Sequence, residues 1–252
     1  MLEDLKDRNV LITGSSIGIG AAVAREMGRL GARVAVHGNR NLIAAQKVVE
    51  DIERSGGFSA LISGDVSKPD SAARIVADAA SALGGIDILI NNAGSLIRRL
   101  SNEDFDNALY DQVFDLNVRS IYTITQAALP HLKKRGGAII NSGSIAGRNG
   151  GAMGSSVYSA AKAAVHSISR NMAREFAPFG IRVNTVAPGF IDTDFHAITS
   201  EEGRQAAQNA TALKRLGTVE DCLGAYVFLA SDSMSGYITG QIIDVNGGQM
   251  MP

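Results

Sequence analysis

The stretch "NVLITGSSIGIGAAVAREMGRL", residues 9–30, decides the fold, because a short β-rich run leads through a glycine-rich turn directly into a helical pattern. Gly14, Gly18 and Gly20 stand at this junction. Glycines let a pyrophosphate approach the backbone closely, and the N–H groups at a helix N-terminus present a partial positive charge to it. A strand, a glycine turn and a helix in this order predict a dinucleotide-binding unit.

Similar β-rich runs alternate with helical patterns along the rest of the chain. The expected strands are residues 9–13, 33–37, 58–63, 86–92, 138–143, 181–187 and 241–245. The segments with helical apolar spacing are residues 18–30, 41–55, 68–83, 104–135 and 155–179. Strands nearly continuous in Val, Ile and Leu are typical of sheets buried on both faces. The pattern predicts an α/β fold, a Rossmann-type doubly wound parallel sheet with helices on both faces, over residues 1–252 as a single domain.

Composition and charge exclude several classes of function. The chain has 252 residues, 45% of them hydrophobic, and a formal net charge of −1, so it has no basic field for nucleic acid or an anionic membrane. Cys222 is the only cysteine, and the four histidines lack zinc-site spacing, so no metal is expected. No apolar run approaches the roughly 18–20 residues of a membrane span, and residues 1–10 do not resemble a signal peptide. We expect a cytoplasmic protein.

One helical pattern carries a phenol and an ammonium group on the same face. Tyr158 and Lys162 are four residues apart in "SSVYSAAKAAVHSIS", residues 155–169. A free tyrosine has a pKa of about 10 and is a poor acid–base group at neutral pH. A neighbouring ammonium favours the phenolate and lowers that pKa. The pair therefore predicts acid–base chemistry in which Lys162 tunes Tyr158.

Seven motifs, in order along the chain, carry a resemblance to a known family. They are TGSSIGIG (13–20), GDV (64–66), NNAG (91–94), LNVRS (116–120), NSGSIAG (141–147), YSAAK (158–162) and NTVAPGFIDT (184–193). Their order resembles the short-chain dehydrogenase/reductase family from residue 9 to about 248. The resemblance implies an oxidoreductase that interconverts a ketone and a secondary alcohol with NAD(P). It also implies a homotetramer packed through the helical segments 104–135 and 155–179 and the C-terminal strand.

The resemblance also assigns contacts with the cofactor. Asp65 would lie by the adenine amino group, Ile191 near the nicotinamide, and Thr193 at its carboxamide. The NNAG motif would steady the sheet beneath the cofactor. The residues expected to contact the cofactor are Gly14, Ser16, Ile17, Gly18, Ile19, Gly20, Asn39, Arg40, Asp65, Val66, Asn92, Ala93, Gly94, Tyr158, Lys162, Pro188, Gly189, Ile191 and Thr193.

The end of the second strand bears on which nicotinamide cofactor is used. An acidic residue there usually holds the free 2′-hydroxyl of NAD. In "VAVHGNRN" that position falls on Gly38, and Arg40 with Asn39 beside it is available for a 2′-phosphate. NADP(H) is therefore favoured. NAD(H) stays as the alternative, because Ile17 stands where many NADP-preferring relatives carry a basic residue.

Four residues match the catalytic set of the family. Tyr158 is expected as the acid–base residue, and Lys162 would also hydrogen-bond the nicotinamide ribose. Ser144, directly before "IAG", matches the serine that hydrogen-bonds the substrate carbonyl, in preference to Ser142. Asn117 matches the asparagine that holds a water for proton relay from the lysine. Because all four are present, we expect an active enzyme, and a non-catalytic dinucleotide-sensing protein is the remote alternative.

The first of two substrate classes is a 3-oxoacyl thioester. Residues 195–217, which include "RLG", and the ending "GYITGQIIDVNGGQMM" resemble 3-oxoacyl-acyl carrier protein reductases. "KKR", residues 133–135, fits one docking position for an acidic carrier protein. The second docking arginine of the family falls on Phe179, so the carrier protein stays an open partner.

The second class is a sugar acid. "NNAGSLIRRL", residues 91–100, is similar to the NNAG-x-IRR sequence of dehydrogenases of acids such as gluconate and 2-deoxygluconate. Arg98 and Arg99 could clamp a carboxylate with charged hydrogen bonds. Phe195 begins the segment expected to select the substrate. A small-molecule carbonyl or alcohol is expected in either case, with the acyl reductase narrowly preferred.

Overall fold

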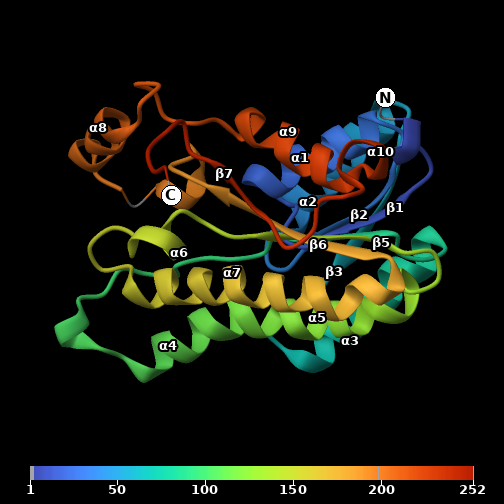
Figure 1. Cartoon of the computed structure of the whole chain (residues 1–252), viewed down its shortest axis with the longest axis horizontal. Helices are drawn as coiled ribbons and strands as arrows, with labels where there is room; N and C mark the ends of the chain where they lie inside the picture. The colour runs from blue at the N-terminus through green and yellow to red at the C-terminus, as the bar shows by residue number, and fades with distance from the viewer. Residues whose placement is uncertain (1–2, 198, 252) are drawn as a thin grey trace.

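The computed structural model describes residues 3–197 and 199–251, which form a seven-stranded parallel sheet in the order β3-β2-β1-β4-β5-β6-β7 (Figure 1). The strands are β1 Asn9–Ile12, β2 Arg33–Gly38, β3 Phe58–Ser63, β4 Ile88–Asn91, β5 Gly137–Ser142, β6 Ile181–Pro188 and β7 Ile242–Val245. All six strand pairs are parallel. Each strand lies on a run expected from the sequence, so the doubly wound α/β prediction is confirmed.

Helices cover both faces of this sheet. They are α1 Gly18–Arg29, α2 Leu42–Arg54, α3 Pro69–Leu83, α4 Asn107–Phe114, α5 Ser120–Leu132, α6 Ala146–Asn149, α7 Ser156–Phe176, α8 Glu201–Ala210, α9 Val219–Ala230 and α10 Asp232–Ser235. Short 3-10 turns span Glu3–Leu5, Asn102–Asp104, Ala177–Phe179 and Asp194–His196. Helices α1, α2 and α9 pack on one face, and α3, α5 and α7 pack on the other (Figure 1).

The strands bury alternate side chains in two separate apolar cores. On β1, Val10 and Ile12 join the core beneath α1 and α9, and Leu11 joins the core beneath α3 and α7. On β4, Ile88 joins the core beneath α1 and α9, and Leu89 joins the core beneath α3 and α7. Both faces of a parallel strand need apolar residues for this reason, which explains the continuous aliphatic runs.

The segment expected as one helix over residues 104–135 is interrupted. Helices α4 and α5 are joined by a five-residue π-helical turn, Asp115–Arg119. Such turns occur as single bulges within α-helices and are frequent at functional sites. Asn117 lies in the turn and its side chain is fully buried. The prediction of one helix missed the bulge, because its extra residue shifts the apolar spacing by only one position.

Helix α9 was not expected from the sequence, because its residues "VEDCLGAYVFLA" are apolar around most of the helix. The helix packs against α1 and the sheet, so little of it faces water. Its start is fixed by a capping box between Thr218 and Asp221. No helix in the described part of the chain is both long and apolar enough to span a lipid bilayer.

Candidate active site

The turn after β1 requires glycine and is held from the neighbouring strand. Gly14 has φ +65° and Gly18 has φ +57°, a left-handed conformation that side chains disfavour. A Cβ atom on Gly14 would lie 2.8 Å from the Cα of Ala93. The side-chain amide of Asn92 donates to the carbonyl oxygens of Thr13 at 3.1 Å and Gly14 at 3.0 Å. The ends of β1 and β4 therefore form one rigid edge.

The N-terminus of α1 opens at the same edge. Ser16 and Ile19 are half-buried in this segment, and Ile17, at the N-cap, makes no side-chain cap and is 46% exposed. The first N–H groups of a helix have no partner within it, so an uncapped start leaves them for an anionic ligand. Gly20 packs against Asn92 so closely that a Cβ atom would collide with its amide. The cradle fits the diphosphate of a dinucleotide.

A buried histidine joins this turn to the next two strands. His37, on β2, is 2% exposed, and its Nδ1 accepts a hydrogen bond from the N–H of Gly14 at 3.0 Å. Its Nε2 lies 3.1 Å from the carbonyl oxygen of Gly64 at the end of β3. Burial lowers the pKa of His37, although the Gly64 carbonyl and the charge of Asp65 oppose this. Sequence analysis did not predict this role, because it depends on contacts with Gly14 and Gly64 that are distant along the chain.

The residues expected around the adenosine end lie beyond His37. Asn39 and Arg40 are exposed, directly after β2. Asp65 accepts hydrogen bonds at Oδ1 from the backbone N–H and hydroxyl of Ser67, at 3.0 and 2.7 Å. Partial burial acts to raise the pKa of Asp65, but these hydrogen bonds and the charges of Lys68 and Arg40 keep it below its usual value. Val66, the next residue, is buried at 4% exposure.

The four expected catalytic residues meet at the carboxyl edge of β5. The side chain of Ser144 lies close enough to the Tyr158 hydroxyl to act on its pKa. The Nζ atom of Lys162 donates to the carbonyl oxygen of Ser142 at 2.7 Å and lies 5.6 Å from the centre of the Tyr158 ring. Lys162 is 4% exposed. A phenol, a hydroxyl and an ammonium group therefore surround one small space.

The protonation of this cluster differs from the sequence expectation. Burial raises the pKa of Tyr158 to about 12, and the hydrogen bond with Ser144 only partly opposes that rise. Burial also lowers the pKa of Lys162 to about 8. Burial thus acts against the expected lowering of the Tyr158 pKa, and tuning of Tyr158 by Lys162 stays a prediction. The lysine, rather than the tyrosine, titrates nearest to neutral pH.

Asn117 presents an unused acceptor to the same space. Its side-chain amide donates to the carbonyl oxygens of Ser95 at 2.8 Å and Val113 at 2.9 Å, and its Oδ1 is buried without a hydrogen-bond partner. A Cβ atom on Gly94 would lie 2.6 Å from that Oδ1 and 3.1 Å from the Nζ of Lys162. Because a buried acceptor without a partner is costly, this oxygen and the lysine are suited to a shared polar ligand.

The segment after β6 closes the site from the other side. Pro188 ends β6 and the N–H of Gly189 donates to Val245 at 2.9 Å. Ile191 is 4% exposed, and Thr193 lies against Gly18, whose Cβ would be 3.8 Å from the Thr193 Cγ2 atom. The loops after β1 and β6 therefore meet across the cofactor cradle.

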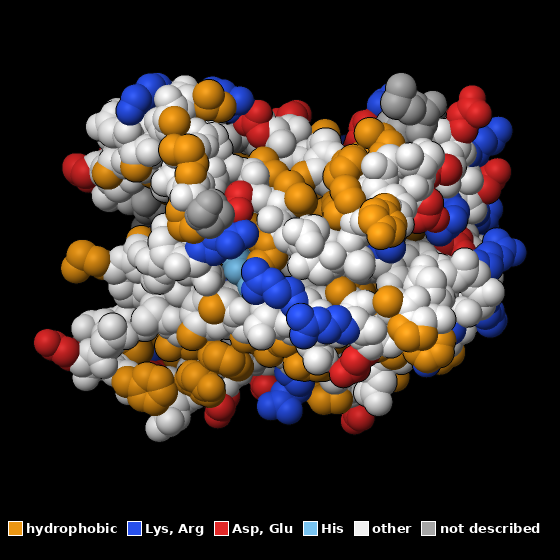
Figure 2. Space-filling model, in the orientation of Figure 1, with side chains coloured by type: hydrophobic (Ala, Val, Ile, Leu, Met, Phe, Trp, Pro, Cys, Tyr) orange, Lys and Arg blue, Asp and Glu red, His pale blue; other side chains and the backbone are white. Residues whose placement is uncertain are grey.

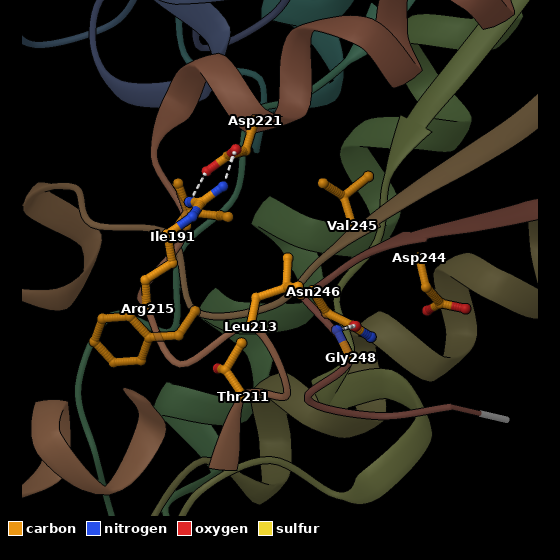
Figure 3. A pocket seen from close by; sticks show the side chains of 12 residues that line it. Ile191, Thr211, Leu213, Arg215, Asp221, Asp244, Val245, Asn246 and Gly248 are labelled. Carbon is orange, nitrogen blue, oxygen red and sulfur yellow. Dashed lines mark hydrogen bonds and ion pairs between the residues drawn. The ribbon is translucent and has the colours of Figure 1, made fainter. Parts of the chain in front are cut away.

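A cavity of about 270 Å³ lies behind this segment, between residues 211–217 and the end of β7 (Figure 3). Arg215 and Asp221 form a two-pronged ion pair at its wall, and the Oδ1 of Asn246 accepts from the N–H of Gly248. Ile191 is the only expected cofactor residue that lines it. The cavity is therefore separate from the space around Tyr158.

Aromatic rings extend from Tyr158 towards the surface. The ring of Phe195, expected from the sequence at the substrate, is 5.5 Å from that of Tyr158, centre to centre. Phe195 in turn meets the ring of His196 at 5.1 Å, and His196 stacks on Phe190 at 3.7 Å. The sequence did not predict a role for His196, because its neighbours come from separate turns of an irregular segment.

The two expected carboxylate ligands do not act as a pair. Arg98 forms an ion pair with Asp106 on the surface, whereas Arg99 donates to the carbonyl oxygen of Met153 at 3.1 Å. The tandem clamp expected from the sequence is therefore wrong in this arrangement. Only Arg99 reaches towards the ring cluster, where its charge acts on His196.

Comparisons with known proteins agree with this geometry. Residues 14–250 match the family model described as "Enoyl-(Acyl carrier protein) reductase". The 3-oxoacyl-[acyl-carrier-protein] reductase FabG of Staphylococcus epidermidis is 37% identical over 250 residues, which cover 97% of this chain and 100% of that protein.

Two solved structures share the whole fold. The NADH-dependent reductase A1-R′, responsible for alginate metabolism, is 42% identical with a TM-score of 0.92 and covers 99% of this chain and 100% of its own. A short-chain dehydrogenase from Burkholderia cenocepacia, in complex with NADP, is 34% identical with a TM-score of 0.91 over 98% and 99% of the chains.

The fold and the cradle at its carboxyl edge define a nicotinamide dinucleotide-dependent oxidoreductase. The chain belongs to the short-chain dehydrogenase/reductase family, whose members interconvert carbonyl and alcohol groups of small molecules.

Proposed function

We propose that the protein reduces a 3-oxoacyl thioester to the corresponding secondary alcohol with NADPH. The observation that supports this most directly is that Tyr158 lies beside Ser144, with the Lys162 ammonium group 5.6 Å from the Tyr158 ring centre, at the edge that carries the glycine turn. The 37% identical FabG relative supports the thioester. In this proposal residues 1–252 act as one catalytic unit.

Each side chain has a distinct proposed role. The hydroxyl groups of Ser144 and Tyr158 bind the substrate carbonyl oxygen, which orients the carbonyl carbon and holds negative charge as it develops. Tyr158 gives its proton to that oxygen. Lys162 and the free acceptor of Asn117 then hold a water through which the proton is replaced. The bound nicotinamide supplies the hydride.

NADP(H) is the proposed cofactor because a cation stands where its extra phosphate would lie. Arg40 is exposed beyond β2, close enough to Asp65 to influence its pKa. No carboxylate occurs between residues 34 and 41 to bind a free 2′-hydroxyl. A guanidinium group matches phosphate geometry with paired hydrogen bonds.

The surface around residues 133–135 and Phe179 is the expected docking site for an acyl carrier protein. Lys133, of the basic run 133–135, lies with its Nζ atom 3.7 Å from the ring centre of Phe179. In this cation–π contact the Lys133 ammonium group stays exposed. Phe179, however, places an apolar ring at the position where the resemblance expects a second docking arginine. We therefore propose carrier-free thioesters as adequate substrates.

A homotetramer is proposed on the basis of exposed apolar groups. Figure 2 shows hydrophobic side chains gathered along one edge, over α4 and α5. Phe105 is 56% exposed, Tyr110 39% and Tyr122 52%. Contiguous exposed apolar groups of this kind mark protein–protein contacts. Sedimentation velocity of the wild type and of Tyr122→Glu tests this directly, and a monomeric wild type contradicts it.

A second candidate function is reduction of a ketone in a sugar acid. It is favoured by Arg99, which has no acidic partner among the described residues, and by the 42% identical reductase responsible for alginate metabolism.

The deciding experiment is a steady-state assay with both substrate classes. Acetoacetyl-CoA reduction is measured with NADPH and NADH, and oxidation of gluconate and 2-deoxygluconate with NADP⁺ and NAD⁺. Thioester turnover with NADPH is expected. Turnover of the sugar acids alone would favour the second candidate function. Tyr158→Phe serves as the inactive control. If the wild type turns over neither substrate class, both candidate functions are contradicted.

A further inference from the structure

Two adjacent arginines leave the loop after β4 in different directions. Ile97, just before them, has φ +65°, a conformation that is strained for a β-branched residue. The N–H of Ile97 is held by the hydroxyl of Ser95 at 2.9 Å, and the N–H of Arg98 donates to Leu96 at 2.8 Å. This tight reversal sends Arg98 to Asp106 and Arg99 towards residues 151–154. Strain of this kind is maintained where the surrounding structure fixes it, often at binding sites.

Arg99 has no carboxylate partner among the described residues. Its only hydrogen bond in the described part of the chain is to the Met153 carbonyl. Arg204, on α8, bonds to Asp192 at 2.7 Å and lies 5.8 Å from the ring centre of Phe190. The charges of both arginines lower the pKa of His196, so the two guanidinium groups, which come from different segments, are within electrostatic range of the same imidazole.

His196 is the polar centre of this cluster. Its ring is fixed between Phe190 and Phe195, and its buried Nδ1 has no hydrogen-bond partner within residues 3–197 and 199–251. Burial, followed by the charges of Arg99 and Arg204, lowers the pKa of His196 to about 4, against the opposing charge of Asp192. The imidazole is therefore neutral at physiological pH, and the cluster keeps two positive charges against one carboxylate.

The cluster is joined to the reacting end of the site. The Phe195 ring touches both His196 and, at 5.5 Å, the ring of Tyr158. A substrate whose carbonyl oxygen reaches the Tyr158 hydroxyl would thus extend along Phe195 towards the arginines. Binding sites with apolar walls typically use a few polar groups for specificity. Here those polar groups lie at the end away from Tyr158, where they would contact the part of the substrate farthest from its carbonyl.

We propose that Arg99, His196 and Arg204 form a carboxylate-binding subsite that selects oxo acids, in which an acyclic or sugar chain separates a ketone from a free carboxylate. The inference rests on the proposed carbonyl reduction and names the substrate class for its second candidate. Arg99 supplies the uncompensated charge, Nδ1 of neutral His196 supplies a hydrogen bond, and Arg204 shares its guanidinium group between Asp192 and the substrate.

The test compares each acid with its own neutral ester. Straight-chain oxo acids from 3-oxobutanoate to 6-oxoheptanoate, and 5-ketogluconate, are reduced by the holoenzyme beside their methyl esters. A charge-assisted hydrogen bond in a partly buried site raises affinity by about tenfold or more. For at least one chain length, kcat/KM is therefore expected to be about tenfold higher for the acid than for its ester. Binding of the same acids to the enzyme–NADP⁺ complex is measured by calorimetry.

Three variants identify the residues responsible. Arg99→Gln and Arg204→Gln are expected to abolish the acid preference, measured as the ratio of kcat/KM for each acid to that for its ester. His196→Phe keeps a ring between Phe190 and Phe195 and removes Nδ1, so its loss of preference isolates the hydrogen bond. Arg98→Gln is expected to keep the preference, because Arg98 is engaged by Asp106. Arg54→Gln, a paired surface arginine on α2, controls for general charge effects.

The outcomes separate this inference from the proposed function. Acids and esters reduced equally well at every length overturn the subsite and leave carbonyl reduction standing. An equal loss of acid and ester turnover in Arg99→Gln also overturns it, since the residue is then structural. If no oxo compound is reduced but the acids bind and Arg99→Gln abolishes binding, the subsite stands and the proposed reaction fails. Absence of both turnover and binding overturns the subsite.

Discussion

The backbone N–H of Gly14 donates a hydrogen bond to Nδ1 of His37, which is buried on the neighbouring strand, at 3.0 Å. Because Nδ1 accepts here, the proton of the neutral ring must be on Nε2, which faces the carbonyl oxygen of Gly64 at 3.1 Å. One tautomer of one side chain thus connects the glycine turn to the ends of β2 and β3. Protonation of His37 removes the acceptor and must break the contact with Gly14.

His37→Phe is expected to weaken NADPH binding by about tenfold, close to 1.4 kcal/mol, because both hydrogen bonds are lost while ring volume is kept. His37→Gln retains a donor and an acceptor and should recover part of the affinity. Fluorescence titration of NADPH measures both variants. Equal affinity in wild type and His37→Phe would show that the turn is held without the histidine.

The same residue predicts a dependence on pH. The pKa of His37 is lowered in the folded protein, so the unfolded chain binds more protons below about pH 6.5. The stabilisation by the neutral ring is complete above that pH and is lost as the pH falls through the lowered pKa. Urea unfolding between pH 7 and pH 4.5 should show a smaller pH-dependent loss in His37→Phe than in the wild type.

Lys162→Met is expected to abolish turnover and to stabilise the fold. The pKa of Lys162 falls from its ordinary 10.5 to about 8, so its buried charge costs about 3 kcal/mol below pH 8, partly offset by the hydrogen bond to Ser142. A gain of about 2 kcal/mol in the free energy of unfolding at pH 7 is the expected net effect.

The pH dependence provides a check on that cause. Between pH 8 and 10.5 the unfolded chain holds the lysine proton and the folded chain does not, so wild-type stability relative to Lys162→Met should rise across this window. A constant difference from pH 7 to pH 10 in urea titrations would argue that packing, rather than charge, explains any gain.

Arg40→Ala is expected to raise KM for NADPH by about tenfold or more and to leave KM for NADH within about twofold. The reason is that a guanidinium–phosphate contact contributes about 1.5–3 kcal/mol, and NADH has no such phosphate. Steady-state kinetics with each cofactor, with Arg54→Ala as the matched surface control, measure the change. An equal loss with both cofactors would place Arg40 away from the 2′-phosphate.

Gly94→Ala is expected to lower kcat by about 100-fold. The new Cβ atom would lie 2.6 Å from Oδ1 of Asn117 and 3.1 Å from Nζ of Lys162, so both polar groups must move, and displacements near 1 Å can cost that much. Circular dichroism and single-turnover kinetics together separate loss of rate from loss of fold.

The matched control for that variant is Gly224→Ala. Gly224 lies within α9, and a Cβ atom there meets nothing within 4 Å. The change should stabilise the protein by up to about 1 kcal/mol through helix propensity and leave kcat unaltered. A similar loss of kcat in both variants would mean that Gly94 has no special place beside Asn117.

The strands were predictable because their residues face apolar neighbours on both sides, which leaves a continuous signal in the sequence. Leu11 and Ile12 illustrate this, since each is fully buried in a different core. The break at Asp115–Arg119 was missed, because one extra residue shifts the apolar spacing by a single position within a long helical pattern. Helix α9 lacks a polar face, so its periodicity was hidden.

At the site, residues that lie within one short motif were located from the sequence, and those that depend on distant partners were not. Tyr158 and Lys162 share a helix face, so their proximity follows from spacing. The role of His37 depends on Gly14 and Gly64, which are 23 and 27 residues away. The opposite directions of Arg98 and Arg99 depend on the backbone of Ile97, a residue whose side chain gives no such indication.

The π turn between α4 and α5 makes this part of the chain sensitive to length rather than to composition. A π turn holds one residue more than the α-helical turn that it replaces. Deleting one residue between Phe114 and Ser120 would give an uninterrupted helix whose two halves keep their relative orientation, because only the wider turn that holds Asn117 would be lost. The amide of Asn117 would then leave the space beside Gly94 and Lys162. A shorter and more regular helix at this point would fold well and still disassemble the site.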